Sequence, residues 1–362
     1  MNRPHLMLIG GGHAHLPLLR QTRGLLAAGC QVTLISEPTT WYSGMATGVL
    51  GSAYAIGANC IDVAAFCRRV GATFIPGHVQ VIDHAAQHVV HEDGTRLPYD
   101  VLSIDIGSGT AMATVTGAQD HAIQAKPLVG LDHARRRCET LIRAGQRCHV
   151  VVVGGGMSGC EIALNAATLV GARGEVHWCA KHHLAMLPTH ARATVMALAQ
   201  QRGVRVHSVT ITAIDQQQVR GADGFVISGD VVLQATGLQS VSLGQRSGLP
   251  LSADGAIQIT STLAVTGHAN IFAAGDCAHM QSQHLPRLGV VAVRQAACLR
   301  HNLIAAAWSR PLISYRPQKR WLSIMNLGSG MGLALWGTWW WRGRLAWWLK
   351  DTIDRRFMAS FR

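Results

Sequence analysis

The sequence predicts an α/β protein with two parallel-sheet units and a small C-terminal region, and three observations lead to this class. First, a short apolar segment followed by glycines and a helical pattern occurs twice, at residues 4–28 and 149–170. Second, the stretch 270–305 again resembles a buried strand followed by a helix, as if the chain returned to the first sheet. Third, seven of the ten tryptophans lie after residue 315.

The first glycine segment predicts a βαβ unit. Residues 4–9 and 31–35 are predicted strands, and residues 13–28 a predicted helix. Glycines at such a position let the backbone approach a pyrophosphate, which accepts hydrogen bonds from the helix N-terminus. Glu37, at the end of the second strand, can accept hydrogen bonds from ribose hydroxyls. The predicted residues of the phosphate loop are Gly10, Gly12, His13, Ala14 and His15.

Two histidines make this loop unusual. His15 occupies the third glycine position of GxGxxG, so the first loop matches the pattern only in part. His13 and His15 are metal ligands in one interpretation, but no cluster of other ligand-type residues accompanies them. We therefore expect no metal, and histidines that pack or form hydrogen bonds beside the phosphate.

The second loop matches the pattern in full, with Gly154, Gly156 and Gly159 between a strand and a helix. The strand at 175–179 does not end at an acidic residue, however, but continues into Ala180-Lys181-His182-His183. Loss of the carboxylate and gain of cations favours a 2′-phosphate, hence NADPH over NADH. NADH binding, or a degenerate site that binds neither, are the alternatives.

Two later strand ends are predicted to face the same ligands. Gly237 follows the strand at 231–234, and Gly275-Asp276 follows the strand at 271–274. Asp276 can bind a sugar-like chain such as ribitol, and a helix from about residue 290 could stabilise negative charge on a reduced flavin. We therefore predict two Rossmann-like dinucleotide-binding domains of the three-layer ββα type, the second inserted in the first.

The composition narrows the function further. Hydrophobic residues make up 48% of the chain and charged residues 14%, which permits large cores. The net charge of +13 attracts polyanions, but no nucleic-acid-binding motif is present, so we expect no nucleic-acid partner. The nine cysteines form no CxxC pair, and the N-terminus has no secretion signal, so we expect a reduced, cytoplasmic protein.

These motifs, in this order, resemble the FAD/NAD(P)-dependent pyridine nucleotide-disulfide oxidoreductases. The details are similar to the branch of type II NADH dehydrogenases and sulfide:quinone reductases, and to the FAD-dependent oxidoreductase domain associated with selenophosphate synthase. The resemblance covers nearly the whole chain. It rests on residues 10–15, 42–45, 99–108, Lys126-Pro127, Gly289, residues 292–295, Lys350-Asp351 and residues 353–358.

The resemblance implies an FAD-binding domain of residues 1–126 and 246–310, an NAD(P)H-binding domain of residues 127–245, and a C-terminal region of residues 311–362. Lys126 and Arg287 would lie near the flavin ring, and Glu161 near the nicotinamide, so these are the candidate catalytic residues. Arg287 stands where relatives often have lysine. Ser108 joins the predicted cofactor-binding residues together with Gly10, Gly12, Glu37 and Asp276.

Two departures from the resemblance concern sulfur chemistry. The segment 41–50, where disulfide reductases of this superfamily have CxxxxC, contains no cysteine. Cys160 and Cys277 are the nearest candidates for cysteines at the flavin, and packing is the simpler interpretation of both. No selenophosphate synthase domain follows, so a role in selenium metabolism rests on the resemblance alone.

The predicted function is hydride transfer from NAD(P)H to FAD, followed by electron transfer to a quinone or similar acceptor. The alternatives are a sulfur- or selenium-linked flavin oxidoreductase, and a flavin-binding protein with a degenerate nicotinamide site. The tail combines tryptophans with arginines, which suits a headgroup region on the inner face of the membrane. Its apolar stretch at 327–341 is too short to span a bilayer. Alternatively, the tail packs as strands and a helix over the flavin or in a homodimer interface.

Overall fold

The centre of the first unit in the computed structural model, which describes residues 3–110 and 115–362, is a five-stranded parallel sheet. Its strands are β1 (His5–Ile9), β2 (Gln31–Ser36), β5 (Thr73–Pro76), β9 (Val101–Ile104) and β21 (Ile271–Ala273). Their spatial order is β21–β9–β1–β2–β5. Because β21 pairs with β9, the chain returns to the first sheet, and the predicted insertion of the second unit is confirmed.

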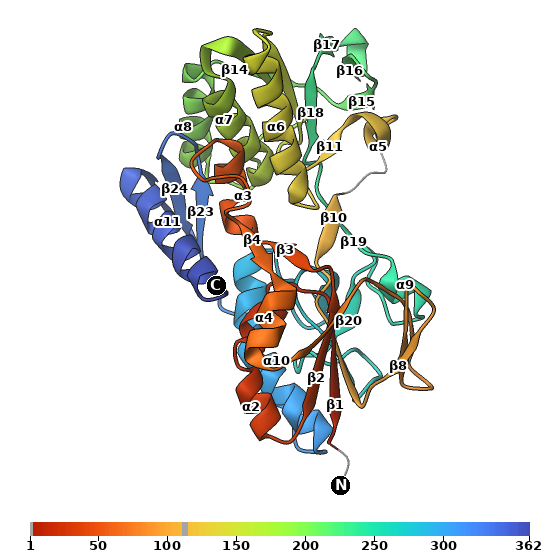
Figure 1. Cartoon of the computed structure of the whole chain (residues 1–362). Helices are drawn as coiled ribbons and strands as arrows, with labels where there is room; N and C mark the ends of the chain where they lie inside the picture. The colour runs from red at the N-terminus through yellow and green to blue at the C-terminus, as the bar shows by residue number, and fades with distance from the viewer. Residues whose placement is uncertain (1–2, 111–114) are drawn as a thin grey trace.

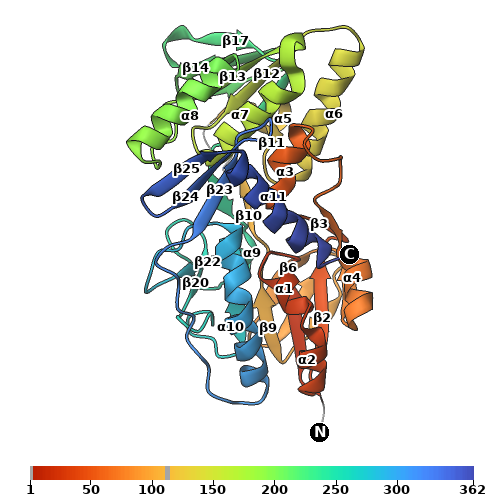
Figure 2. The same ribbon diagram turned by 90° about the vertical axis from the view of Figure 1, so that its left-hand side faces the viewer.

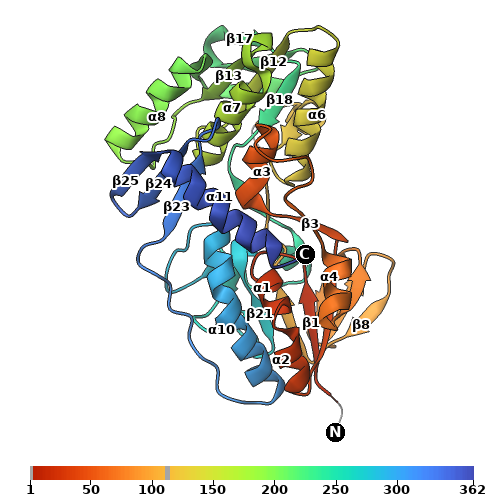
Figure 3. The ribbon, with the colours of Figure 1, turned by 60° about the vertical axis from the view of Figure 1, so that its left-hand side comes forward.

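Helices cover one face of this sheet and a small antiparallel sheet covers the other (Figures 1 and 3), which is the predicted three-layer arrangement. The helices are α1 (His15–Leu19), α2 (Thr22–Ala27) and α10 (Gly289–Ala307), and α4 (Val63–Val70) packs beside β5. The antiparallel strands are β6 (Val79–Asp83), β7 (His88–His91) and β8 (Arg96–Pro98). Small pairs complete the unit: β3 (Thr39–Trp41) with β4 (Cys60–Asp62), and β20 (Ile257–Ile259) with β22 (Ala278–Met280).

The continuous helix predicted over residues 13–28 is wrong. Between α1 and α2, Gln21 leaves the helical conformation, with φ −103° and ψ 17°. The Thr22 hydroxyl donates a hydrogen bond to the Leu19 carbonyl at 2.6 Å. Threonine side chains that bond to nearby backbone in this way compete with helix propagation, and apolar periodicity alone does not reveal the break.

The second unit repeats the architecture of the first. Its parallel strands are β11 (Ile123–Gln124), β12 (Cys148–Val153), β13 (Gly174–Ala180), β14 (Val204–Ser208) and β18 (Val231–Gln234), in the order β11–β18–β12–β13–β14. On one side lie α6 (Val129–Arg143), α7 (Met157–Val170) and α8 (Thr189–Gln201). On the other lie β15 (Ile211–Ile214), β16 (Gln218–Gly221) and β17 (Val226–Ser228) (Figure 1). The predicted helix at 189–201 and strand at 231–234 are confirmed residue for residue.

A strand pair and a helix are among the contacts that join the two units. The strand β10 (Ser108–Thr110) pairs with β19 (Leu238–Ser240), so the chain crosses between the units as a two-stranded ribbon. The helix α3 (Ser43–Leu50), from the first unit in sequence, packs on α6 and α7 of the second. Since β11 already belongs to the second sheet, the chain enters the second unit shortly before residue 126. The domain boundaries themselves remain predictions.

The C-terminal region packs over both units and is called the C-terminal layer below (Figure 2). It consists of the antiparallel strands β23 (Leu322–Asn326), β24 (Gly332–Trp336) and β25 (Trp339–Gly343), followed by α11 (Arg344–Ala359). Met358 joins the core of the first unit, whereas Met325 and Leu333 join the core of the second. The tail therefore forms strands and a helix, and its place over the flavin, in a homodimer interface or at a membrane stays a prediction. Across the described ranges, no helix has both the length and the apolar character needed to cross a membrane.

Candidate functional site

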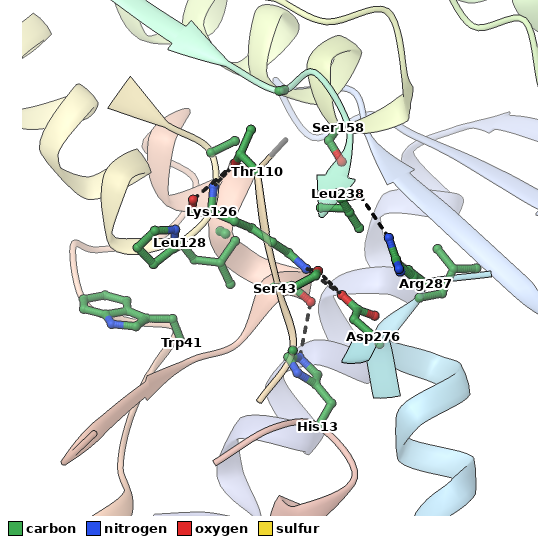
Figure 4. Close-up of a pocket in the computed structure, with 18 of the residues that line it drawn as sticks. His13, Trp41, Ser43, Thr110, Lys126, Leu128, Ser158, Leu238, Asp276 and Arg287 are labelled. Carbon is green, nitrogen blue, oxygen red and sulfur yellow. Dashed lines mark hydrogen bonds and ion pairs between the residues drawn. The ribbon is translucent and has the colours of Figure 1, made fainter. Parts of the chain in front are cut away.

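One large cavity, of about 2130 Å³, runs between the two units and under the C-terminal layer (Figure 4). Pockets for single small ligands usually have volumes of roughly 300–1,000 Å³, so this cavity has room for two dinucleotides. Both glycine loops line it, at the carboxyl ends of β1 and β12, where α/β folds bind their ligands. From the C-terminal region, β23 and α11 contribute one wall.

The first glycine loop is held by Asp105, at the end of the neighbouring strand. Its carboxylate accepts hydrogen bonds from the backbone N–H groups of Ala14 (2.6 Å) and His15 (3.0 Å). A Cβ atom on Gly12 would overlap that carboxylate, so the loop requires glycine there. Burial raises the pKa of Asp105 to about 6, although the two N–H groups act in the opposite direction. Asp105 thus fixes the shape of the loop from behind.

This loop suits a pyrophosphate. Within the part of the chain that the structure describes, the backbone N–H groups of Gly11 and His13 have no hydrogen-bond partner, and both residues line the cavity. Such free donors before a helix are what a phosphate group requires. The donor set therefore fits the diphosphate of FAD.

The two histidines of the loop have different surroundings. His15 is fully buried, with Nδ1 2.7 Å from the Gly10 carbonyl and Nε2 2.7 Å from the Ser103 hydroxyl. His13 lines the cavity, with Nε2 3.3 Å from the Ser43 hydroxyl (Figure 4). Burial lowers the pKa of both rings, that of His15 to about 4, so both are neutral at pH 7. Among the described residues, no group of three or more His, Cys, Asp or Glu side chains is arranged to hold a metal ion.

Lys126 and Asp276 meet in the middle of the cavity. The ammonium group lies 2.7 Å from the Asp276 carboxylate (Figure 4). The Ser108 hydroxyl donates a hydrogen bond to the same oxygen at 2.8 Å. Burial alone would raise the pKa of Asp276, but the charge and hydrogen bond of Lys126 outweigh it and lower the pKa. The sequence predicts each of these residues for the flavin site, and the structure brings them together.

Glu37 and Arg287 also line the cavity, at separate points. Glu37 follows β2 and lies 2.5 Å from His78 Nε2, with both side chains 60% exposed. Arg287 donates to the Leu238 carbonyl at 2.9 Å and forms an ion pair with Asp254 at 2.7 Å. Its guanidinium thus connects the segment just before α10 with strand β19, which runs between the units.

The second glycine loop has the close packing that its pattern predicts. Gly154 and Gly156 line the cavity, while a Cβ on Gly159 would overlap the Gly154 carbonyl. A third glycine in this role permits close contact between helix and strand. Gly237 also lines the cavity. Ala14, His15, Gly159 and Gly275, by contrast, do not line the cavity and support its loops from behind.

Glu161 is at the junction of the second unit and the C-terminal layer. Its carboxylate accepts a hydrogen bond from the Asn326 backbone N–H, on β23. Burial raises its pKa to about 7, although the nearby Lys350 ammonium acts in the opposite direction. Lys350 itself forms an ion pair with Asp354 at 2.8 Å, and Asp354 accepts a hydrogen bond from the Tyr42 hydroxyl, also at 2.8 Å.

Comparison with known proteins identifies the family. The sequence profile of the pyridine nucleotide-disulphide oxidoreductases matches residues 4–296. The chain belongs to this family. It is therefore an oxidoreductase with the FAD and NAD(P)H cofactors of the family, and the predicted resemblance and fold class are confirmed.

Individual relatives agree with this assignment. The demethylphylloquinone reductase NdbB of Synechocystis sp. is 29% identical over 286 residues, covering 74% of this chain and 71% of its own. The alternative NAD(P)H-ubiquinone oxidoreductase C1 of Arabidopsis thaliana is 29% identical over 277 residues, covering 68% of this chain and 51% of its own. The match therefore spans about half the length of the plant protein. NDH2 from Plasmodium falciparum, solved in complex with NADH, shares the fold over 99% of this chain and 97% of its own, with a TM-score of 0.84 at 13% identity.

The two candidate cysteines, Cys160 and Cys277, do not face the cavity. Both are buried. Burial raises the pKa of Cys160, and raises that of Cys277 to about 12. Both thiols are therefore protonated at pH 7 and unreactive as nucleophiles. Packing, the simpler interpretation from the sequence, agrees with these surroundings.

Three cavity residues, Asp105, Lys350 and Asp354, lie in segments that carry the resemblance, but the sequence analysis assigned them no role in the site. Asp105 lies within the strand predicted over residues 101–106, and a carboxylate near the end of an otherwise apolar strand is a signal that could have identified it. The pairing of Lys350 with Asp354 has the i, i+4 spacing of a helix, but nothing in the sequence indicates that it faces Glu161.

Proposed function

We propose that this chain is an FAD-dependent NAD(P)H:quinone oxidoreductase. The observation that carries the proposal is the continuous cavity between two glycine loops, one of which has free phosphate donors. NdbB of Synechocystis sp. is named a demethylphylloquinone reductase, and the Arabidopsis relative an NAD(P)H-ubiquinone oxidoreductase. We extend this class of acceptor to the present chain.

The first unit would hold FAD. The N–H groups of Gly11 and His13 bind the diphosphate, Glu37 the adenosine ribose and Asp276 the ribitol chain. Bound flavin supplies hydride acceptance from the nicotinamide and electron transfer to the second substrate. Lys126 and the N-terminus of α10 both line the cavity, and they would supply positive charge that stabilises a negatively charged flavin ring.

Glu161 would act next to the nicotinamide. With a pKa of about 7, its carboxyl group is about half protonated at neutral pH, so it can donate or accept a hydrogen bond or a proton. Asn326 and Thr47 fix its orientation by hydrogen bonds. Protonation of Glu161 would therefore change its interactions with Asn326 and Lys350, which belong to the C-terminal wall.

The acceptor would bind against that wall. Leu322, Ile324, Ile353 and Phe357 line the cavity there and give it an apolar surface suited to a quinone ring. Lys350 and Asp354 lie at its edge, and their ion pair supplies polar contacts for the quinone oxygens.

A turnover assay tests the acceptor. The FAD-loaded protein is mixed with NADH or NADPH and a water-soluble benzoquinone, and nicotinamide oxidation is followed. We expect oxidation that requires both the quinone and bound FAD. If the nicotinamide reduces the flavin but no quinone reoxidises it, the acceptor assignment is wrong and another acceptor class must be sought.

We further propose that the C-terminal layer contacts the inner face of the cytoplasmic membrane. Trp339 and Trp348 are 75% and 61% exposed, and Leu345 is 77% exposed. Arg342 and Arg344, both exposed, lie between them in sequence and suit anionic headgroups. Tryptophans beside arginines at such a surface favour lipid over water.

Vesicle sedimentation tests this contact. We expect the full chain to sediment with vesicles containing anionic phospholipid, and Trp339→Ala with Trp348→Ala to weaken that binding at least tenfold. The control Trp308→Ala, outside the C-terminal layer, should bind as before. A homodimer through the same surface is the competing outcome: a doubled mass in solution, lost in the double variant, without vesicle binding.

A further inference from the structure

The end of β13 differs in charge from the corresponding strand end of the first unit. In the first unit, the Gly10 N–H donates to the Ile35 carbonyl at 2.8 Å, and Glu37 follows two residues later. In the second unit, the Gly154 N–H donates to the Cys179 carbonyl at 3.0 Å. The same hydrogen bond thus fixes the correspondence between the two halves, and Lys181 stands where the first unit has Glu37.

The residues after β13 face the cavity. Lys181 and His182 are exposed and line the cavity. Ala180 points its Cβ at the glycine loop, 2.9 Å from where a side-chain carbon at Gly155 would lie. A carboxylate that binds ribose would stand at residue 181, in the position of Glu37, and this chain has lysine there.

No carboxylate competes for these cations. The described carboxylates that line the cavity are Glu37, Asp105, Glu161, Asp276 and Asp354. Glu37, Asp105 and Asp276 follow β2, β9 and β21, respectively. Glu161 lies on α7 and Asp354 on α11, so none of the five lies on β13 or directly after it. Neither Lys181 nor His182 has an ion-pair or hydrogen-bond partner within residues 3–110 and 115–362.

We infer that the nicotinamide substrate is NADPH, and that Lys181 and His182 form the binding site for its 2′-phosphate. The inference rests on the proposed function, since it names the reductant of the same cavity. A ribose phosphate carries up to two negative charges and three acceptor oxygens, which suit an ammonium and an imidazole. NADH would offer only a hydroxyl to these groups, with no carboxylate present to accept its hydrogen bonds.

A binding measurement separates this site from catalysis. Adenosine 2′,5′-bisphosphate and adenosine 5′-monophosphate are titrated into the FAD-loaded protein by calorimetry. We expect the bisphosphate to bind at least tenfold more tightly, since a charge-assisted contact to phosphate is a strong one. Lys181→Gln should remove most of this difference without weakening the monophosphate. The matched control is Lys319→Gln, an exposed lysine that does not line the cavity.

A charge reversal gives the complementary test. Lys181→Glu copies the residue of the first unit, so we expect it to bind the monophosphate better than the bisphosphate. Flavin reduction should then be faster with NADH than with NADPH, the opposite of the parent protein. Equal affinity of the parent for both probes, or faster reduction of its flavin by NADH, would overturn the inference. If neither nicotinamide reduces the flavin while the probes still differ, the proposed function fails and the phosphate site stands.

Discussion

Glu161 offers the sharpest quantitative prediction, because its carboxyl group loses solvent on folding. Its pKa rises from a usual value of 4.5 to about 7, with burial as the main cause. An acid with a raised pKa in the folded state favours the protonated form. The raised pKa therefore costs almost no stability below pH 4.5. As the pH rises from 4.5 to about 7, the free energy of unfolding falls progressively, and above 7 this loss levels off.

The size of this penalty follows from the two pKa values. Between pH 5 and pH 8 it grows by about 2.5 kcal/mol. For a chain of 362 residues this corresponds to a difference of about 3 °C in Tm. Glu161→Gln abolishes the titration, while its amide oxygen can still accept the hydrogen bond from Asn326. The variant should therefore lose less stability than the parent as the pH rises.

Thermal unfolding of the FAD-loaded parent and variant at pH 5 and pH 8 provides the assay. We expect the difference in Tm between the two proteins to change by about 3 °C in favour of Glu161→Gln at the higher pH. Glu92→Gln, which changes an exposed glutamate, is the matched control and should follow the parent. If Glu161→Gln and the parent lose stability in parallel, Glu161 is not held protonated by burial and the reasoning is refuted.

Substitutions at three further sites test the cavity. Lys126→Met leaves Asp276 without its cation, so we expect the free energy of unfolding to fall by about 1–3 kcal/mol. Flavin fluorescence should then appear at a lower temperature on heating. Lys126→Arg keeps the cation and should largely preserve both properties. Arg287→Ala removes the contacts of Arg287, just before α10, with Leu238 on β19 and with Asp254. Urea unfolding should then show a loss of about 1–2 kcal/mol in the free energy of unfolding, which Arg287→Lys should partly restore. Gly12→Ala adds a carbon that overlaps the Asp105 carboxylate, so the protein should be obtained with little bound FAD. In Gly156→Ala the added carbon meets only one atom at 4.0 Å, so this variant should retain FAD. Equal FAD content by absorbance would show that the first loop does not require glycine at residue 12.

Much of the fold could be predicted because its signals are local. The second glycine loop lies between an apolar strand and a helix, and the structure places both within one residue of the prediction. The return strand at 271–273 was recognisable from its apolar residues and the Gly-Asp that follows. The break at Gln21 was not, because the hydrogen bond of a single threonine hydroxyl decides it.

The site was predicted only in part, because some of its contacts join distant parts of the chain. Lys126 and Asp276 were each predicted, yet their contact depends on the return of the chain to the first sheet. The proximity of Glu161 to Lys350 depends on how the C-terminal layer packs, and periodicity within the tail does not specify that packing. The tryptophans of the tail suggested either membrane contact or packing against the rest of the protein. The structure shows that residues of the tail form one wall of the cavity.

The most direct test of the central claim is anaerobic stopped-flow mixing of the FAD-loaded protein with NADPH and NADH separately, monitored at the flavin absorbance near ~450 nm. We predict fast bleaching by a nicotinamide in a single turnover, followed by recovery of the colour when quinone is added. If neither nicotinamide bleaches a flavin that dithionite reduces readily, the claim that this cavity transfers a hydride from NAD(P)H to FAD is contradicted.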